Sequence, residues 1–208
     1  MRDSNGHLLA ALVQRDGGLV TSIELVGDRD LLQIKAQMER LLRQADIVLT
    51  TGGTASGECD QALRAVRLTG AKLLFWGVKI KPGSHCGAAV YDDKLIISLS
   101  GNPAACAAGY HLLAAPVLRL LQGLNPYPEY VTAVCTSSFL KKGGPRRFIQ
   151  ANLEINKEGL KVTIMPGQKS SMLRGLLNNG NALIDLPAGH PPLEAGAEVS
   201  VIILNTIK

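Results

Sequence analysis

Three short segments of the sequence gather glycine, hydroxyl and charged residues in combinations that bind anions. The first is residues 51–60, which read TGGTASGECD. Glycines let the backbone approach a ligand closely and aim N–H groups at phosphate oxygens, and hydroxyl groups supply further donors. We therefore expect a phosphate-like ligand to contact a set of six residues: Thr51, Gly52, Gly53, Thr54, Ser56 and Gly57.

Two carboxylates in the same segment, Glu58 and Asp60, complicate this expectation because they repel a phosphate. They fit if together they hold a divalent cation. Asp60 also fits as the N-cap of the helix that is expected to follow. The residues alone leave both interpretations open.

The second and third segments follow other predicted strands. Residues 79–85 read KIKPGSH, where Lys81 and the turn residue Gly83 can bring a mobile ammonium group to an oxyanion. An ordinary turn with solvated lysines is the alternative. Residues 98–103 read SLSGNP and offer a hydroxyl group, an amide and a helix start pre-set by proline, or only a helix cap. The candidates in this third segment are Ser100, Gly101, Asn102 and Pro103.

Strand and helix patterns alternate through the first two thirds of the chain, which predicts an α/β fold with a parallel sheet and helices on both faces. Ligands of such sheets bind beyond the carboxyl ends of the strands, so the three segments should meet at one rim. We assign residues 1–124 to this domain. Its predicted strands are 19–25, 46–50, 73–80 and 94–99, and its predicted helices are 8–13, 31–42, 60–68 and 103–121.

Short alternating segments separated by Gly and Pro turns recur in the last third. They predict a small β domain over residues 125–208. Its predicted strands are 131–135, 148–155, 160–164, 182–186 and 198–204.

The composition limits the classes of ligand and the cellular location that we expect for the protein. The net charge of +5 is scattered, which suits a small anionic ligand but does not form a run long enough to track a nucleic acid. The four cysteines form no CxxC pair, so we expect reduced thiols and no zinc finger. The apolar stretch 104–121 is interrupted by polar residues and is expected to be a buried helix, not a membrane span. With no signal-like start, we expect a cytoplasmic protein.

Several motifs together resemble one family. TTGGTASGECD, VKIKPG, LSGNP and GQKSSML, with DSNGHLLAAL near the start, follow the order and spacing of the MoeA-type molybdopterin molybdotransferases, which include the gephyrin E domain. The resemblance covers almost the whole chain. It implies a MogA-like α/β domain followed by a small C-terminal domain that is similar to a β-barrel.

The resemblance implies that the protein inserts molybdate into adenylated molybdopterin with Mg²⁺ or a similar divalent cation, yielding molybdenum cofactor and AMP. Cations and oriented amides stabilise the charges of such a reaction. By resemblance, Gly52, Gly53 and Ser56 would contact the pterin phosphate, Asp60 and Glu58 would serve the cation and catalysis, and Lys81 would hold molybdate or phosphate. Gly101, Asn102 and Pro103 would form a third wall, and Ser170 would close the oxyanion site.

The sequence departs from the family pattern at the oxyanion site. Ser84 and His85 stand in place of a lysine and a proline, the residues after Pro103 lack a hydroxyl group, and Pro145 stands where the family has an arginine, with Arg146 and Arg147 beside it. Each lost charge-assisted hydrogen bond is worth about 1.5–3 kcal/mol. These departures weaken the prediction of a catalytic site and leave the prediction of a pterin site intact.

The resemblance also implies that a strand is missing. Family members carry two N-terminal domains and a strand with the motif TGDEL before the segment that here begins at Asp3, and they act as dimers. A gap in the sheet would leave backbone groups unpaired. We expect a separate N-terminal polypeptide, a swapped protomer of a homodimer or an upstream segment to complete the sheet.

Three functions remain open from the sequence. The first is a molybdotransferase that works with a complementing chain. The second is a non-catalytic molybdopterin-binding or carrier module, which the changed oxyanion residues favour. The third is a molybdopterin adenylyltransferase, which shares the TTGGT loop but not the GNP loop or the β domain.

Overall fold

The structure, a computed structural model, describes residues 3–27, 30–53, 60–166 and 180–205. The chain divides into two compact units, which are described separately. Unit 1 comprises Met1–Val78 and Gly83–Pro126, and unit 2 comprises Lys79–Pro82 and Tyr127–Lys208. A short piece of the first two thirds, which contains Lys81, therefore belongs to unit 2.

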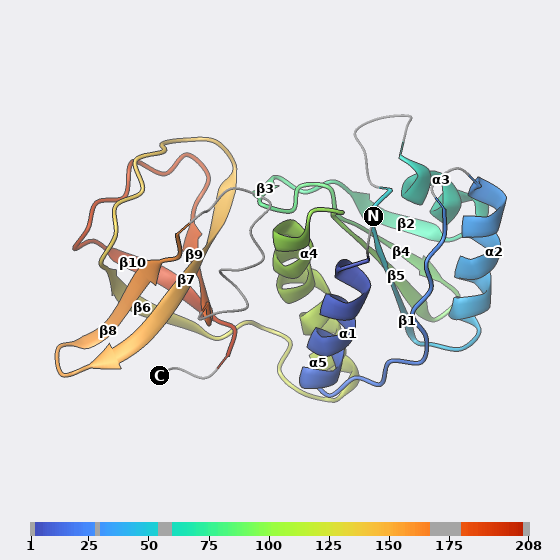
Figure 1. The fold of residues 1–208 in the computed structure, drawn as a ribbon, viewed down its shortest axis with the longest axis horizontal. Helices are drawn as coiled ribbons and strands as arrows, with labels where there is room; N and C mark the ends of the chain where they lie inside the picture. The colour runs from blue at the N-terminus through green and yellow to red at the C-terminus, as the bar shows by residue number, and fades with distance from the viewer. Residues whose placement is uncertain (1–2, 28–29, 54–59, 167–179, 206–208) are drawn as a thin grey trace. The chain divides into compact units, whose positions relative to one another are not determined.

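Unit 1 is an α/β domain, and the predicted fold class is confirmed (Figure 1). Its strands are β1 (Ile47–Thr51), β2 (Lys72–Trp76), β4 (Gly87–Tyr91) and β5 (Lys94–Leu99), in the sheet order β1-β5-β4-β2. Its helices are α1 (Asn5–Arg15), α2 (Leu31–Leu42), α3 (Gln61–Leu68), α4 (Pro103–Gly109) and α5 (Ala115–Leu121), with a π-helical turn at Tyr110–Ala114 between the last two.

The sheet is mixed, not wholly parallel. β1 and β5 run parallel, in register from Ile47 opposite Leu95 to Thr51 opposite Leu99. β4 runs antiparallel to both of its neighbours, β5 and β2. A tight hairpin joins β4 to β5. That hairpin turns at Asp92, which has a φ of 49°. Neither β4 nor this turn was among the elements predicted from the sequence.

Two predicted strands need correction. Residues 19–25 form no strand, although they alternate like one. The predicted strand 73–80 is two pieces: β2 ends at Trp76, Gly77 follows with a φ of 87°, and β3 (Ile80–Lys81) pairs with a strand of unit 2. Only glycine adopts that conformation at little cost, so the break has a local cause.

Helices cover both faces of the unit 1 sheet (Figure 1). On one face Leu9 of α1 packs with Leu99 and Tyr110, and on the other Met38 and Leu42 of α2 pack with other core residues, among them Val48 of β1. Successive residues of β1 thus serve opposite cores, which is the pattern of a strand buried on both faces.

The stretch Pro103–Leu121 is long and apolar enough to cross a membrane by length and composition, but 50% of its most apolar window is buried inside the protein. Within this stretch Pro116 lacks the N–H group that a helical hydrogen bond requires, and its ring crowds the preceding turn of the helix. The neighbouring π-helical turn accommodates this defect. The observed burial agrees with the interpretation as a core helix.

Unit 2 is a closed five-stranded barrel with one added strand. β6 (Tyr130–Cys135), β7 (Arg146–Asn156), β8 (Gly159–Ile164), β9 (Ala182–Leu186) and β10 (Glu198–Ile203) follow the predicted strands closely. The order is β7-β8-β6-β10-β9, the pairing of β7 with β9 closes the ring, and β3 adds to β7. The predicted barrel-like domain is confirmed.

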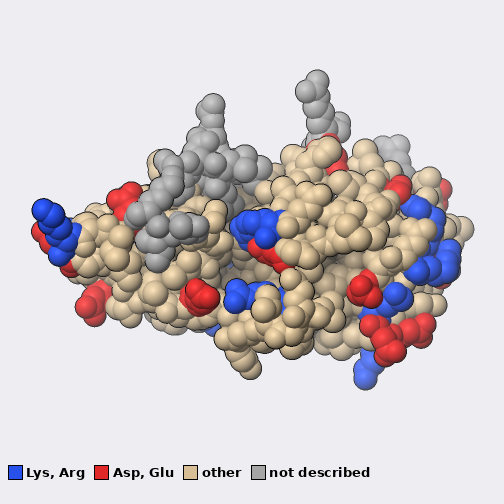
Figure 2. All heavy atoms as spheres, turned by 90° about the horizontal axis from the view of Figure 1, so that it is seen from below, with Lys and Arg blue, Asp and Glu red and all other residues tan. Residues whose placement is uncertain are grey.

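Charged side chains are mixed over the face shown in Figure 2. Blue basic groups and red acidic groups alternate on a surface that is largely tan, and the described residues of this face form no continuous basic stripe. Such a surface does not follow a polyanion backbone.

His111 makes the stability of unit 1 depend on pH. It packs edge-on against Tyr110, with ring centroids 5.5 Å apart, and Tyr110 donates to Asp16 Oδ2 at 2.8 Å. Burial, with the nearby charge of Arg15, lowers the pKa of His111 to about 4. The unfolded chain takes up this proton near pH 6.5, so the unfolded state binds more protons between pH 6.5 and 4.

We expect the free energy of unfolding to fall by about 2 kcal/mol between pH 7 and pH 5 on account of His111 alone. His111→Gln should remove that part of the pH dependence in denaturant titrations, whereas His7→Gln, at an exposed position, should not. Equal slopes for the parent and His111→Gln would contradict the assignment.

Candidate functional site

The first and third predicted loops meet at the carboxyl ends of β1 and β5. A Cβ atom built on Gly101 would lie 3.1 Å from the Cα of Gly52 and 3.6 Å from its nitrogen. Gly52 and Gly53 have φ values of 82° and 63°. A side chain at position 101 would therefore require the Gly52 backbone to shift by a few tenths of an ångström, and the positive φ values turn the backbone of the first loop where the strand ends.

Asn5 ties the two loops to the start of α1, a role that the sequence reading missed. Its Nδ2 donates to Thr51 Oγ1 at 2.8 Å and to the Gly101 carbonyl at 2.9 Å. The side chain is buried, and its Oδ1 has no hydrogen-bond partner among the described residues. Asn5 is the first residue of α1, which follows the N-cap Ser4, and Asp3 Oδ1 accepts from Gly6 N at 2.9 Å.

Hydroxyl groups fix the register of the two strands below the loops. Thr50 donates to Ser98 Oγ at 2.9 Å, and Thr51 Oγ1 donates to the Ser100 carbonyl at 3.1 Å. Ser100 Oγ donates to the His85 carbonyl at 3.2 Å. The end of the second loop therefore also lies against the third, within unit 1.

Asn102 is the N-cap of α4. Its Oδ1 accepts from Ala104 N at 3.1 Å and from Ala105 N at 3.2 Å, and Pro103 occupies the first helical turn. The cap interpretation of this loop is thus observed. A cap uses only the oxygen of the amide, and the Nδ2 of Asn102 donates to no described residue.

Asp60 is a buried N-cap that also binds the only tryptophan. It is 2% exposed, its Oδ1 accepts from Leu63 N at 3.0 Å, and its Oδ2 accepts from Trp76 Nε1 at 2.8 Å. Gly87 makes this possible, because a Cβ atom there would lie 2.1 Å from the indole ring. The bonds join the start of α3 to β2.

Cys106 of α4 is buried close to Thr51. Burial raises the pKa of its thiol to about 11, although the Thr51 hydroxyl group, 3.5 Å from the sulfur, acts in the opposite direction. Cys86, Cys106 and Cys135 are free and buried. At neutral pH these three side chains are protonated and chemically inert.

Lys81 lies in unit 2, beside a second cation. β3 pairs with β7 so that Lys81 stands opposite Arg147, and partners in adjacent strands share a face of the sheet. Arg147 Nε donates to His190 Nε2 at 3.1 Å, and its guanidinium lies 5.8 Å from the centre of the Phe139 ring. The terminal nitrogens of Arg147 donate to no described residue.

Arg146 is engaged differently. Its Nε donates to Asp185 Oδ1 at 2.7 Å and its Nη2 donates to Oδ2 of the same carboxylate. Tyr130 also donates to Asp185 Oδ2, at 3.1 Å. Since this bidentate pair neutralises Arg146, Arg147 is the arginine that can join Lys81 in holding an anion.

Several predicted site residues lie outside the described residues. They are Thr54, Ser56, Gly57, Glu58 and Ser170. Gly83 is described, buried and part of unit 1, with a φ of 97°. Among the described residues, no three His, Cys, Asp or Glu side chains gather as metal ligands.

Comparison with known families gives two matches that together span most of the chain. Residues 1–120 match a family described as a probable molybdopterin binding domain, and residues 132–204 match the MoeA C-terminal region (domain IV). The chain is 32% identical to a molybdopterin molybdenumtransferase of Staphylococcus epidermidis over 207 residues, which is 99% of the chain and 49% of that protein. The chain thus spans about half the length of the curated relatives it matches.

Solved structures give the same picture of the fold. A molybdenum cofactor biosynthesis protein from Pyrococcus furiosus superimposes with a TM-score of 0.74 at 26% identity, over 97% of this chain and 64% of that chain. A molybdopterin biosynthesis MoeA protein from Pyrococcus horikoshii superimposes with a TM-score of 0.78 at 21% identity, over 99% and 49% of the two chains. The second likeness concerns the fold alone.

The hydrogen bond between Asp60 and Trp76 can be tested by a double-mutant cycle. Asp60→Asn places an amide where the carboxylate accepts from the indole, and Trp76→Phe removes the donor. We expect each single change to cost about 1–3 kcal/mol of unfolding free energy, with a coupling of about 1 kcal/mol between them. Urea titrations followed by circular dichroism measure both.

Asp46→Asn, the same change at an exposed position, should cost less than about 0.5 kcal/mol. If the effects of Asp60→Asn and Trp76→Phe simply add, this hydrogen bond does not stabilise unit 1.

Proposed function

The chain belongs to the probable molybdopterin-binding domain family, and from that premise we propose that it acts in molybdenum cofactor biosynthesis by binding molybdopterin, or its adenylate, at the rim of unit 1. The contact between Gly52 and Gly101 carries the proposal, because it joins two loops of bare backbone at the carboxyl ends of parallel strands. Such a rim is where open α/β sheets bind their ligands.

The polar groups at this rim suit a pterin with a phosphate. The backbone at Gly52 and Gly53 offers N–H groups without side chains to hinder an anion. The buried Oδ1 of Asn5, which accepts from none of the described residues, would accept from a ligand N–H group after a small rearrangement. The rim therefore supplies donors for the phosphate and an acceptor for a ring nitrogen.

We propose that Lys81 and Arg147 of unit 2 hold the oxyanion, molybdate or a phosphate. They stand opposite each other on neighbouring strands, and two cations on one face attract a doubly charged anion. Stacking on Phe139 and the bond to His190 hold the Arg147 side chain in place. Arg147 thus offsets the charge that the family pattern has at position 84, where this chain has Ser84.

The resemblance also implies a magnesium ion, and the described residues do not form a site for one. Both oxygens of Asp60 accept from protein donors, and no further described carboxylate gathers with it. Glu58 lies outside the described residues. The roles of Asp60 and Glu58 as ligands of a divalent cation stay predictions.

The principal function we propose is molybdate insertion into adenylated molybdopterin, carried out with a complementing polypeptide or as a homodimer in the cytoplasm. A non-catalytic molybdopterin carrier is the second candidate, favoured by Ser84 and Pro145 at positions where the family has cations. Calorimetry separates them, because a carrier binds molybdopterin but not molybdate. ATP-dependent adenylation of molybdopterin would instead identify an adenylyltransferase.

Binding at the rim is tested by Gly101→Ala. The added methyl group would lie 3.1 Å from the Gly52 backbone and push the two loops apart. We expect molybdopterin affinity, measured by anaerobic calorimetry, to fall at least about tenfold, with a stability loss of about 1–3 kcal/mol. Gly27→Ala is the matched control, because a Cβ atom at Gly27 meets nothing within 4 Å.

Unchanged affinity in a folded Gly101→Ala protein would place the pterin site elsewhere. Circular dichroism and a thermal melt of the same sample distinguish this result from a failure to fold.

The oxyanion proposal is tested in unit 2. Lys81→Ala and Arg147→Gln should each weaken molybdate binding about tenfold or more, since each removes a charge-assisted hydrogen bond. Lys157→Gln neutralises an exposed lysine of the same unit and should have little effect. Molybdate binding that survives both changes together would exclude this pair as the site.

A further inference from the structure

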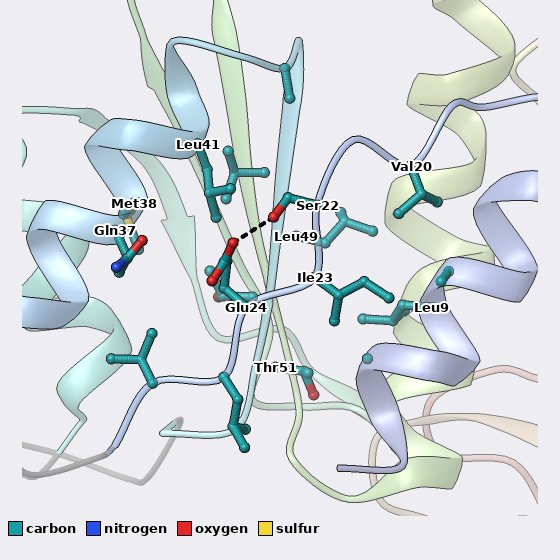
Figure 3. Close-up of a pocket in the computed structure, with 18 of the residues that line it drawn as sticks. Leu9, Val20, Ser22, Ile23, Glu24, Gln37, Met38, Leu41, Leu49 and Thr51 are labelled. Carbon is teal, nitrogen blue, oxygen red and sulfur yellow. Dashed lines mark hydrogen bonds between the residues drawn. The ribbon is translucent and has the colours of Figure 1, made fainter.

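The cavity of unit 1 and the cation pair of unit 2 differ in charge. The cavity has a volume of about 300 Å³, and apolar side chains such as Met38 line it (Figure 3). The carboxylates of Asp3 and Glu24 also belong to its lining, whereas no described Lys, Arg or His does. Such walls do not attract a free, doubly charged anion. The two cations proposed to hold the oxyanion lie in unit 2.

His190 is the buried partner of one of these cations. The residue is 3% exposed. Its Nε2 lies 3.1 Å from Arg147 Nε, and its Nδ1 lies 2.8 Å from the carbonyl oxygen of Pro191. Both ring nitrogens therefore have a partner. Each partner can play only one part in a hydrogen bond, because a guanidinium donates and a carbonyl oxygen accepts.

These two partners determine the protonation of His190. The Nε of Arg147 carries its hydrogen at any pH that the folded protein meets, so Nε2 of His190 must be a bare acceptor. The carbonyl of Pro191 accepts, so Nδ1 must carry the hydrogen. The ring is therefore neutral. A second proton on Nε2 would place two donors and two positive charges against each other, which breaks the bond to Arg147.

No described carboxylate pairs with the ring to stabilise a second proton. The Phe139 ring lies 6.1 Å from the His190 ring between centroids, and Gly143 N donates to the His190 carbonyl at 2.8 Å. Asp185 is bonded to Arg146. The elements around the ring carry further ionisable residues, none of which is bonded to it: Lys81, Lys141, Lys142, Arg146, Asp185 and Glu194.

The bond to His190 also decides which side of Arg147 can meet a ligand. Nε is occupied, so the two terminal nitrogens, which donate to no described residue, remain available. Nη2 lies against Gly144, where a Cβ atom would come within 3.3 Å of it. A guanidinium presented by its terminal nitrogens matches two oxygens of a tetrahedral anion. Lys81 stands opposite on the neighbouring strand.

We propose that His190 is a positioning residue that makes oxyanion binding in unit 2 depend on pH. Neutral His190 holds Arg147 beside Lys81, and uptake of a proton by His190 releases Arg147. The inference rests on the proposed role of Lys81 and Arg147 in holding an oxyanion. Because the anion prefers the protein with neutral His190, its affinity falls as the pH falls, and the bound anion in turn opposes protonation of His190.

The sign of this effect is distinctive. A histidine that merely gains a positive charge near an anion site strengthens anion binding at low pH. His190 should do the opposite, since its proton removes a better-placed cation, Arg147, from the site.

The hydrogen bond itself is tested by NMR of the full chain without any anion. At pH 8 the ring nitrogens of His190 should show the Nδ1–H tautomer. The Nε–H of Arg147 should exchange with water at least about tenfold more slowly than that of Arg43, which is exposed. On acidification to pH 5, protonation of His190 should abolish this protection. The other tautomer, a ring that stays neutral at pH 5, or protection that survives protonation would overturn the inference.

Anion binding is measured by calorimetry with sulfate, a tetrahedral anion that keeps both charges from pH 8 to pH 5, and with molybdate at pH 8. Sulfate affinity of the parent should fall at least about fivefold over this range, since a charge-assisted bond is lost. His7→Gln, at an exposed position, should show the same fall. Arg147→Gln should bind weakly at pH 8 and lose nothing more at pH 5, because His190 acts through Arg147.

Two substitutions of His190 separate positioning from packing. His190→Leu keeps an apolar side chain but offers no acceptor, so sulfate should bind about fivefold or more weakly than to the parent at pH 8. The side-chain oxygen of His190→Gln can accept from Arg147 and takes up no proton, so this variant should recover most of that affinity and keep it at pH 5. A packing role alone predicts the reverse order. Circular dichroism verifies that both variants fold.

The outcomes distinguish this inference from the proposed function. If sulfate and molybdate bind the parent but sulfate affinity stays constant or rises toward pH 5, the inference fails and the proposed site stands. If neither anion binds at any pH, both fail.

Discussion

The parallel pairing of β1 with β5 is the constraint on which the rest of unit 1 depends. In register from Ile47 to Thr51, it brings two strands to an end at the same level, so that the loops after them must share one space. Gly101 then approaches Gly52 so closely that a Cβ atom at position 101 would lie 3.1 Å from the Gly52 Cα. A slip by one residue would turn every side chain of β1 to the wrong core, and the bond from Thr50 to Ser98 opposes such a slip.

Asp60 illustrates how the structure resolves an ambiguous residue. A buried carboxylate is costly unless it is well hydrogen-bonded, and here two N–H groups on different elements satisfy it. This arrangement gives the carboxylate at the end of the candidate loop a structural role, because the α3 backbone and the Trp76 indole both donate to it. A purely catalytic reading of the residue overlooks that it fastens the helix after the loop to the sheet.

Most elements could be predicted because their signal is local. The apolar run before the TGGT loop, the proline at the start of α4 and the alternating strands of unit 2 are each written within a few residues. The wrong predictions concern segments whose structure depends on a strand partner that is distant in the sequence. Residues 19–25 alternate like a strand but pair with no strand in the described part of the chain, and Ile80–Lys81 follow β2 closely in the sequence but pair with β7 in unit 2.

The same distinction explains the candidate site. Gly52 and Gly101 could be named from residue type, and the structure brings them together, whereas Asn102 is observed as a helix cap, the alternative left open by the sequence. Asn5 was not, because its bonds to Thr51 and to Gly101 span sequence separations that no local pattern encodes. Arg147 was named without a role, since only the pairing with Lys81 and the loss of Arg146 to Asp185 distinguish the two arginines.

The last residue of β1 links the sheet to the candidate site. Thr51 pairs with Leu99 of β5. Its hydroxyl group accepts from Asn5 Nδ2 at 2.8 Å and donates to the Ser100 carbonyl at 3.1 Å. The same residue thus holds the start of α1 and the third loop against the end of β1. Backbone that is already held in place needs less ordering when a ligand binds, so the pairing of β1 with β5 pre-organises the loops at Gly52 and Gly101.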